Sequence, residues 1–312
     1  MKSWPAAAVA SVAVALAACA SPPEGDPRYR PAENMLEVIT VLRSHVPDDT
    51  YRFEPARDFT GRNVYRASLL RIENLEIAYE GAYRSGYLDD VIAFAKGRAL
   101  ERLGAFDLAA QHYLEAADAG DALRLEALRS AAICQTLSEA TQLEPAPDAA
   151  ATEEPSVVLA RLEGRKALLE AILPDVERSH YLAVVREEIE QGDVARARLL
   201  TDLRSVQPEG DVTAVAAWQQ VILQHRSSKN ANRHLLELAD LYSDLAERYV
   251  DQHPPEGLNF DPPTFEELTD SATRLYEAVA NQDGATERVE AARRLEAFLA
   301  FTLRIDRDRV SR

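Results

Sequence analysis

The segment of residues 89–121 constrains the fold of this chain more than any other. It contains two stretches of about 13 residues in which apolar side chains recur at intervals of three and four, the spacing of one helix face. Residues 103–106, which include Gly104, join the two stretches. Because so short a connection permits only an antiparallel arrangement, the segment is predicted to form a helical hairpin.

Small and large side chains occupy the places where the two predicted helices would touch. Gly97 and Ala109 would let the helix axes approach closely, and Tyr113 would fill the groove between them. The predicted packing residues are Gly97, Leu100, Gly104, Phe106, Ala109, Tyr113 and Ala116. Over 34 residues from Asp90 this pattern resembles a tetratricopeptide repeat. The departures from the repeat are at Ala93, Lys96 and Asp121.

The rest of the chain also has helical spacing. From Pro31 onward there is no run of strict alternation long enough to predict a sheet. The predicted fold class is therefore all-α, and the resemblance implies a tetratricopeptide-like solenoid of helical hairpins, preceded by a cleaved signal peptide. A second, more degenerate hairpin is predicted at residues 181–203, with a turn at residues 191–193. Thr264 and Glu267 are predicted to form a capping box at the start of a later helix.

A change in composition divides the predicted solenoid. Residues 141–156 are rich in Pro, Ala and Glu and have no periodicity, so they are predicted to form a disordered linker. The predicted parts are an N-terminal helical lobe at 32–140, a C-terminal helical-repeat lobe at 157–304 and a charged, fraying tail at 305–312. Helices at 123–137 and 157–173 are expected to pair across the linker, because an insertion adds little to the entropy cost of closing a loop.

The first 18 residues have the features of an export signal. Lys2 follows Met1, and an apolar stretch runs from about residue 6 to residue 16, which is too short and too rich in Ala to span a membrane comfortably. The four residues Leu16, Ala17, Ala18 and Cys19 resemble the lipobox of bacterial lipoproteins. This resemblance implies cleavage before Cys19 and attachment of a diacylglycerol to its sulfur.

The residues after Cys19 give the expected location. Residues 19–31 are polar and rich in Pro, as expected of a flexible tether between an anchor and a folded domain. Ala20 and Ser21 lack the acidic residue of the inner-membrane retention signal. The resemblance therefore implies the periplasmic face of the outer membrane, where the acyl chains on Cys19 would hold the protein to the bilayer.

Charge and cysteine content exclude several classes of protein. With 35 basic and 52 acidic residues, the chain has a net charge of -17 and would be repelled by the phosphates of nucleic acid, so nucleic acid is not expected as a partner. Only two cysteines are present. If Cys19 carries lipid, Cys134 has no intramolecular disulfide partner, and its apolar helical surroundings predict a small buried side chain.

No residue pattern typical of catalysis or metal binding stands out. No two of the six histidines have the i, i+4 spacing of metal ligands, and His234 with Glu237 is interpreted as a solvent-facing polar pair. The acidic pairs Glu187 with Glu188 and Glu266 with Glu267 are interpreted as helix-surface charges. We therefore predict that the protein is not an enzyme and has neither a cofactor nor a metal site.

A mixture of tyrosine and arginine precedes the clear hairpin. The residues of this possible partner-binding site are Tyr65, Tyr79, Tyr83, Tyr87, Arg62 and Arg66. Tyrosine rings and guanidinium groups are typical of hot spots in protein interfaces. The alternative interpretation is that the rings cap the end of the solenoid.

Together these features predict a lipid-anchored scaffold or adaptor that binds a protein or peptide partner. Its predicted layout resembles that of the repeat-containing lipoprotein of the outer-membrane β-barrel assembly machinery and of pilot lipoproteins. One alternative is an envelope enzyme acting on cell-wall glycan, which would need two carboxylates of shifted pKa near an aromatic platform. Another is a structural lipoprotein that associates with itself.

Overall fold

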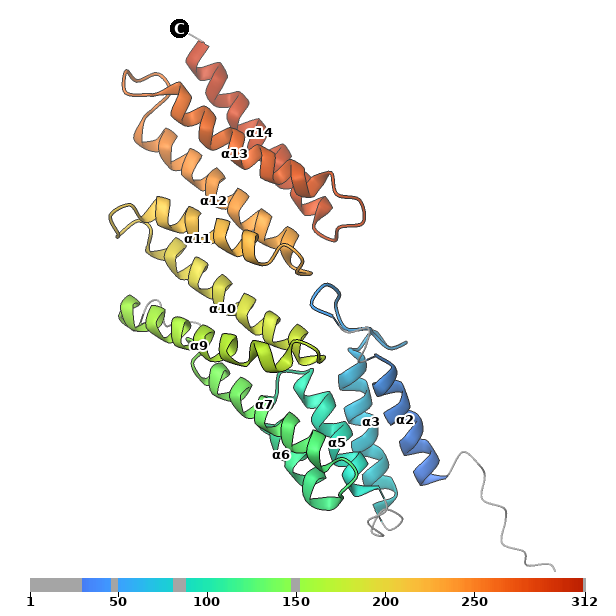
Figure 1. Cartoon of the computed structure of the whole chain (residues 1–312). Helices are drawn as coiled ribbons and strands as arrows, with labels where there is room; N and C mark the ends of the chain where they lie inside the picture. Colours follow the sequence, from blue (N-terminus) through green and yellow to red (C-terminus); the bar gives the residue numbers. More distant parts are fainter. Residues whose placement is uncertain (1–29, 46–49, 81–87, 147–151, 311–312) are drawn as a thin grey trace, which may run out of the picture. The chain divides into compact units, whose positions relative to one another are not determined.

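The computed structural model describes residues 30–45, 50–80, 88–146 and 152–310 (Figure 1). These residues form eleven α-helices and no β-strand, so the predicted all-α class is confirmed. A single isolated bridge joins Arg57 and Asn63. Within the described ranges, each helix is either too short or too polar to cross a bilayer.

The chain divides into two compact units. Unit 1 comprises the residues up to His45 together with Arg57–Ala131, and unit 2 comprises Val46–Ala56 and Ala132–Arg312. The change from unit 1 to unit 2 therefore occurs inside α7 (Arg124–Gln142), and not in the predicted linker at 141–156. α7 remains one helix through this point because its apolar stripe continues, with Ala131 and Cys134 both buried.

Unit 1 contains α2 (Pro31–His45), α3 (Val64–Ala78), α5 (Asp89–Glu101) and α6 (Phe106–Ala119). Helix α3 begins after Asn63, whose side chain accepts a hydrogen bond from the Tyr65 amide at 2.8 Å. α2 packs on α3, α3 on α5, and α5 on α6. The predicted hairpin of α5 and α6 is confirmed, and Gly104 has a φ of 77° in its turn, which a residue with a Cβ adopts poorly.

Close packing joins the two helices of this hairpin. A Cβ on Gly97 would lie 2.9 Å from two ring carbons of Tyr113, so only glycine fits here without a shift of the ring. Tyr113 is fully buried and donates a hydrogen bond from its hydroxyl to Glu101 at 2.5 Å. The other predicted packing residues of the two helices, Leu100, Phe106, Ala109 and Ala116, are also buried.

Unit 2 is an array of helices that pack mainly on their neighbours along the chain (Figure 1). The helices are α9 (Pro155–Val176), α10 (Tyr181–Leu203), α11 (Gly210–Gln224), α12 (Ala231–Gln252), α13 (Pro262–Ala280) and α14 (Arg288–Val310). One apolar cluster surrounds Trp218, and another contains Phe265, Tyr276 and Phe298. Helix α9, which was expected to pair with residues 123–137, packs extensively on α10.

The predicted turn at residues 191–193 is wrong, because α10 runs without interruption from Tyr181 to Leu203. Gly192 is buried inside this helix, and a Cβ there would lie 3.0 Å from a guanidinium nitrogen of Arg165. Arg165 is 1% exposed and donates hydrogen bonds to the Glu188 backbone carbonyl at 3.0 Å and to its carboxylate at 2.6 Å. The glycine makes room for a buried arginine, and the packing outweighs its helix penalty of about 1 kcal/mol.

Two further boundaries differ from the sequence predictions. Helix α13 begins at Pro262, and its cap is Asp261, which accepts hydrogen bonds from the Thr264 amide and hydroxyl, so Thr264 is not the cap. Proline is tolerated in the first turn because its missing N–H would have no helical partner there. The expected fraying is also wrong for residues 305–310, since α14 continues to Val310 and Ile305 is buried, while residues 311–312 lie outside the described residues.

Candidate functional site

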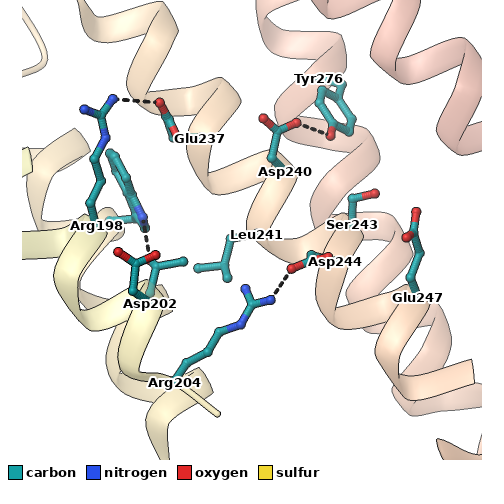
Figure 2. Close-up of a pocket in the computed structure, with 12 residues that line it drawn as sticks. Arg198, Asp202, Arg204, Glu237, Asp240, Leu241, Ser243, Asp244, Glu247 and Tyr276 are labelled. Atoms are coloured by element: carbon teal, nitrogen blue, oxygen red, sulfur yellow. Dashed lines mark hydrogen bonds and ion pairs between the residues drawn. The ribbon is translucent and has the colours of Figure 1, made fainter. Parts of the chain in front are cut away.

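A groove of about 460 Å³ lies among α10, α11, α12 and α13 of unit 2 (Figure 2). Its walls come from one face of each helix, with Trp218 and Leu241 at the apolar base. The charged side chains that line it are Arg198, Asp202, Arg204, Glu237, Asp240, Asp244 and Glu247. Five carboxylates and two guanidinium groups give the lining an excess of negative charge.

Ion pairs cross the groove from α10 to α12. Figure 2 shows the Arg198 guanidinium on the Glu237 carboxylate, at 3.0 Å, and Arg204 on Asp244. The Arg198 side chain is 56% exposed, so its pair exchanges readily with water or with a charged group of a ligand. The carboxylates of Asp202 and Glu247 are exposed at the same groove.

Asp240 is the most constrained carboxylate of the groove. It accepts a hydrogen bond from the Tyr276 hydroxyl at 2.6 Å and pairs with Arg294. Burial raises the pKa of the Asp240 carboxyl above its ordinary value, although Tyr276 and Arg294 act in the opposite direction. Burial and the neighbouring Asp240 also raise the pKa of the Tyr276 hydroxyl. Both carboxylate oxygens are therefore occupied by protein donors, which leaves Asp240 poorly placed for proton transfer to a substrate.

A second, more apolar groove of about 410 Å³ lies on another face of α12. Val215, Tyr242, Leu245 and Leu268 contribute to its wall, and the ion pair of Asp211 with Arg248 lies at its edge. Unit 2 thus offers a charged groove and an apolar groove on the same helix. This combination suits recognition of a polypeptide, which presents both kinds of side chain.

A buried polar network lies around the start of α12, where the His234 ring centroid is 6.4 Å from that of Trp218 at the base of the charged groove. Glu190 accepts hydrogen bonds from Ser228 at 2.6 Å and Asn230 at 3.3 Å, and its carboxylate lies 2.6 Å from His234 Nε2. Burial alone would raise the pKa of the Glu190 carboxyl, but the bonds with His234 and Ser228 outweigh it and hold that pKa below its ordinary value. His234 is therefore buried with Glu190, and its interpretation as a solvent-facing pair with Glu237 is wrong.

A second set of polar contacts joins this part of unit 2 to Tyr51, which lies much earlier in the sequence. The Tyr51 hydroxyl lies 2.6 Å from His225 Nδ1, and His225 Nε2 lies 3.0 Å from Asp193. Lys166 also bonds to Asp193, at 2.9 Å. Burial and nearby Glu190 raise the pKa of the Tyr51 hydroxyl, so the group is a poor nucleophile at neutral pH. Although Tyr51, His225 and Asp193 are linked by hydrogen bonds, as in some catalytic sites, their burial indicates a structural role.

The predicted Tyr and Arg site is only partly available to a partner. Tyr65 is fully buried, so its ring cannot contact a partner, and Arg102 lies over it at 5.9 Å. Tyr79 is half-buried after the end of α3, and Arg62 and Arg66 are exposed. Tyr83 and Tyr87 lie outside the described residues, as do the lipobox residues Leu16, Ala17, Ala18 and Cys19.

Other predicted side chains divide between core and surface. Cys134 is fully buried, as predicted. Glu266 and Glu267 are exposed, as predicted, but Glu188 is not a surface charge, because it is paired with buried Arg165. Burial raises the pKa of the Glu188 carboxyl, against the opposing effect of Arg165. Within the described part of the chain, no three His, Cys, Asp or Glu side chains are grouped so that they could hold a metal ion.

The chain matches no protein-family model and no curated protein sequence. The groove itself was missed at the level of sequence, although a signal for it exists. The acidic residues of α12 that line it are Glu237, Asp240, Asp244 and Glu247. Their spacing of three, four and three places them on one helix face, beside the apolar stripe. This acidic spacing predicts a charged face on α12, but it does not predict that the face lies opposite Arg198 and Arg204.

Proposed function

We propose that this protein is a lipid-anchored scaffold or adaptor that binds a protein or peptide partner at the periplasmic face of the outer membrane. The observation that carries the proposal is the charged groove of α10 to α13 in unit 2. Its ion pair of Arg198 with Glu237 is exposed and exchangeable, and its apolar base contains Trp218 and Leu241. A polar rim around an apolar base is typical of the surfaces that bind other proteins.

The anchor in this proposal depends on the sequence. The lipobox of residues 16–19 and the polar tether after it support acylation of Cys19. A tether of about 12 residues would reach up to roughly 40 Å when extended, so the folded units would remain close to the bilayer surface. The partner would then be bound next to the membrane.

We also infer that the hairpin of α5 and α6 is a tetratricopeptide-like unit. Its support is the contact of Gly97 with Tyr113, together with full burial of Ala109 and Ala116 at the small positions of α6. Arrays of such hairpins commonly work by binding, because stacked helices leave long surfaces between them. The hairpin and the groove thus favour the same class of function.

A photocrosslinking residue in the groove tests the adaptor. With p-benzoylphenylalanine in place of Glu247, we expect a discrete protein adduct in intact cells, identified by mass spectrometry. The matched control carries the same residue in place of Glu163, which is exposed on α9 and does not line the groove. The double variant Asp202→Ala, Asp244→Ala should reduce the adduct from position 247. Recovery of glycan alone, or equal adducts from 163 and 247, would contradict the proposal.

Substitution of Cys19 tests the anchor separately. Cys19→Ala should move the protein out of the outer-membrane fraction and remove the mass of the acyl chains. A parent protein that carries no acyl mass would show that the anchor is wrong, without bearing on the groove.

A further inference from the structure

A tight turn of unit 1, directly before α3, presents a fully exposed phenylalanine. Residues 57–63 form this turn, closed by the bridge of Arg57 with Asn63 and by a hydrogen bond from the Asp58 amide to the Arg62 carbonyl at 2.8 Å. Gly61 has a φ of 78°, as its place in the turn requires. The side chain of Phe59, near the tip, is 100% exposed.

Asp58 holds the turn rigid from within. Its carboxylate accepts hydrogen bonds from the Thr60 amide at 2.8 Å, the Thr60 hydroxyl at 2.6 Å and the Arg62 amide at 3.0 Å. The bond from the Thr60 hydroxyl is the main reason that the pKa of the Asp58 carboxyl lies below its ordinary value. Phe59 is therefore presented on a preorganised backbone, so its use in binding requires little ordering of the chain.

The turn is basic, although the chain as a whole is acidic. Residues 57–66 contain three arginines and one aspartate, a formal charge of +2, whereas the whole chain carries -17. Arg62 and Arg66 are both exposed. The exposed ring thus lies in a segment that attracts anions, although the chain as a whole has a negative net charge.

We propose that this turn docks on the surface of an anionic bilayer, with Phe59 in the headgroup region and the arginines on lipid phosphates. The proposal rests on the proposed anchoring at Cys19, which would keep the turn near lipid at a high effective concentration. A bilayer is favoured over a protein partner because a convex tip with one ring fits a soft interface, whereas a stable protein interface needs about 800 Å² from each partner.

The first test measures insertion in the acylated protein. Phe59→Trp is reconstituted into phosphatidylethanolamine and phosphatidylglycerol vesicles that contain brominated lipid, and tryptophan quenching is recorded. The control is Leu258→Trp, since Leu258 is also fully exposed, in the turn between α12 and α13 of unit 2. Trp218 is buried and contributes the same background fluorescence to both variants. We expect quenching at position 59 to be at least about twice that at position 258, since only the docked ring reaches the lipid.

The second test does not depend on the anchor. Full chains with Cys19→Ala are sedimented with phosphatidylglycerol vesicles or with neutral phosphatidylcholine vesicles. In this background Phe59→Ala should weaken binding to the anionic vesicles about tenfold. Arg62→Ala should weaken it about fivefold, and Arg233→Ala, which removes an exposed charge from α12, should leave it unchanged.

The two tests separate the turn from the anchor. An acylated protein with equal quenching at 59 and 258 overturns the docking proposal and leaves the anchor intact. A protein without acyl mass overturns the anchor, and the vesicle sedimentation then decides on the turn alone. Equal binding by Phe59→Ala and its parent, or photocrosslinking from position 59 to a protein instead of lipid, also overturns the proposal.

Discussion

The ring of Tyr113 lies directly against the backbone of Gly97, where a Cβ would come within 2.9 Å of two ring carbons. The ring cannot easily move, because the Tyr113 side chain is fully buried and its hydroxyl bonds to Glu101. One missing methyl group thus sets how closely α5 and α6 pack.

Replacement of Gly97 should therefore destabilise unit 1. We expect Gly97→Ala to lower the free energy of unfolding by about 1 to 3 kcal/mol, because overpacking outweighs the gain in helix propensity. Urea denaturation followed by circular dichroism measures the change. The matched control is Gly164→Ala on α9, where the new Cβ would meet its nearest atom at 3.9 Å. That variant should be as stable as the parent or slightly more stable, and equal effects of the two substitutions would contradict this account of the hairpin.

Glu190 should be the most sensitive carboxylate of unit 2. Glu190→Gln leaves His234 and Ser228 without the charged acceptor they share, and we expect a loss of about 2 to 4 kcal/mol in the free energy of unfolding at pH 7. Thermal and urea unfolding provide the measurement. Glu163→Gln, on the exposed side of α9, should change the stability by less than about 0.5 kcal/mol. A Glu190 variant as stable as this control would show that the network does not stabilise the fold.

The stability advantage of Asp193 should depend on pH in a defined direction. Burial alone would raise the pKa of this carboxyl, but hydrogen bonds with His225 and Lys166 hold its pKa below the ordinary value of about 4. Such a group stabilises the fold at pH values above its unfolded pKa, and the contribution is lost as the pH falls through the folded pKa. The parent should therefore be more stable than Asp193→Asn by a maximal amount at pH 6 to 7, and this difference in the free energy of unfolding should decrease below about pH 4.

Asp240 provides a control of opposite sign. Because burial raises the pKa of its carboxyl in the folded state, the parent should gain stability relative to Asp240→Asn as the pH falls through that raised value. Urea unfolding between pH 3 and pH 7 measures both series. If the two differences change in the same direction with pH, the assignment of these two environments is incorrect.

Tyr51 should control the attachment of its segment to unit 2. Among residues 50–56 it alone is buried, and its backbone carbonyl also accepts a hydrogen bond from the Lys229 amide at 3.1 Å. Tyr51→Ala should release the segment, so trypsin should cleave after Arg52 several times faster than in the parent. Phe53→Ala removes a neighbouring ring that is 66% exposed and should leave the cleavage rate unchanged. Equal rates for all three proteins would mean that Tyr51 does not hold the segment.

The sequence predicted well where the contacts are local. The hairpin of α5 and α6 was predicted almost to the residue, because apolar spacing and a glycine turn are both encoded within about 30 residues. The start of α13 was missed because Pro262 and Pro263 suggest a loop, although proline suits the first helical turn after a cap such as Asp261.

The long-range polar contacts could not be predicted from patterns in the sequence. Gly192 appears as a turn signal, and its role becomes clear only when Arg165 is seen beside it. Likewise, no periodicity links Glu190 with His234 or Arg204 with Asp244, which lie about 40 residues apart. Side chains that pair between helices leave no spacing to detect in a single sequence.

The pairing of Tyr51 with His225 also bears on the order in which the chain folds. Most helix contacts of unit 2 join neighbours along the sequence and can form after short searches as the polypeptide emerges. Tyr51 and His225 are separated by 174 positions, so this contact can form only after α11 and His225 have been synthesised. The segment around Tyr51 can therefore attach to unit 2 only after nearly three quarters of the chain has been synthesised.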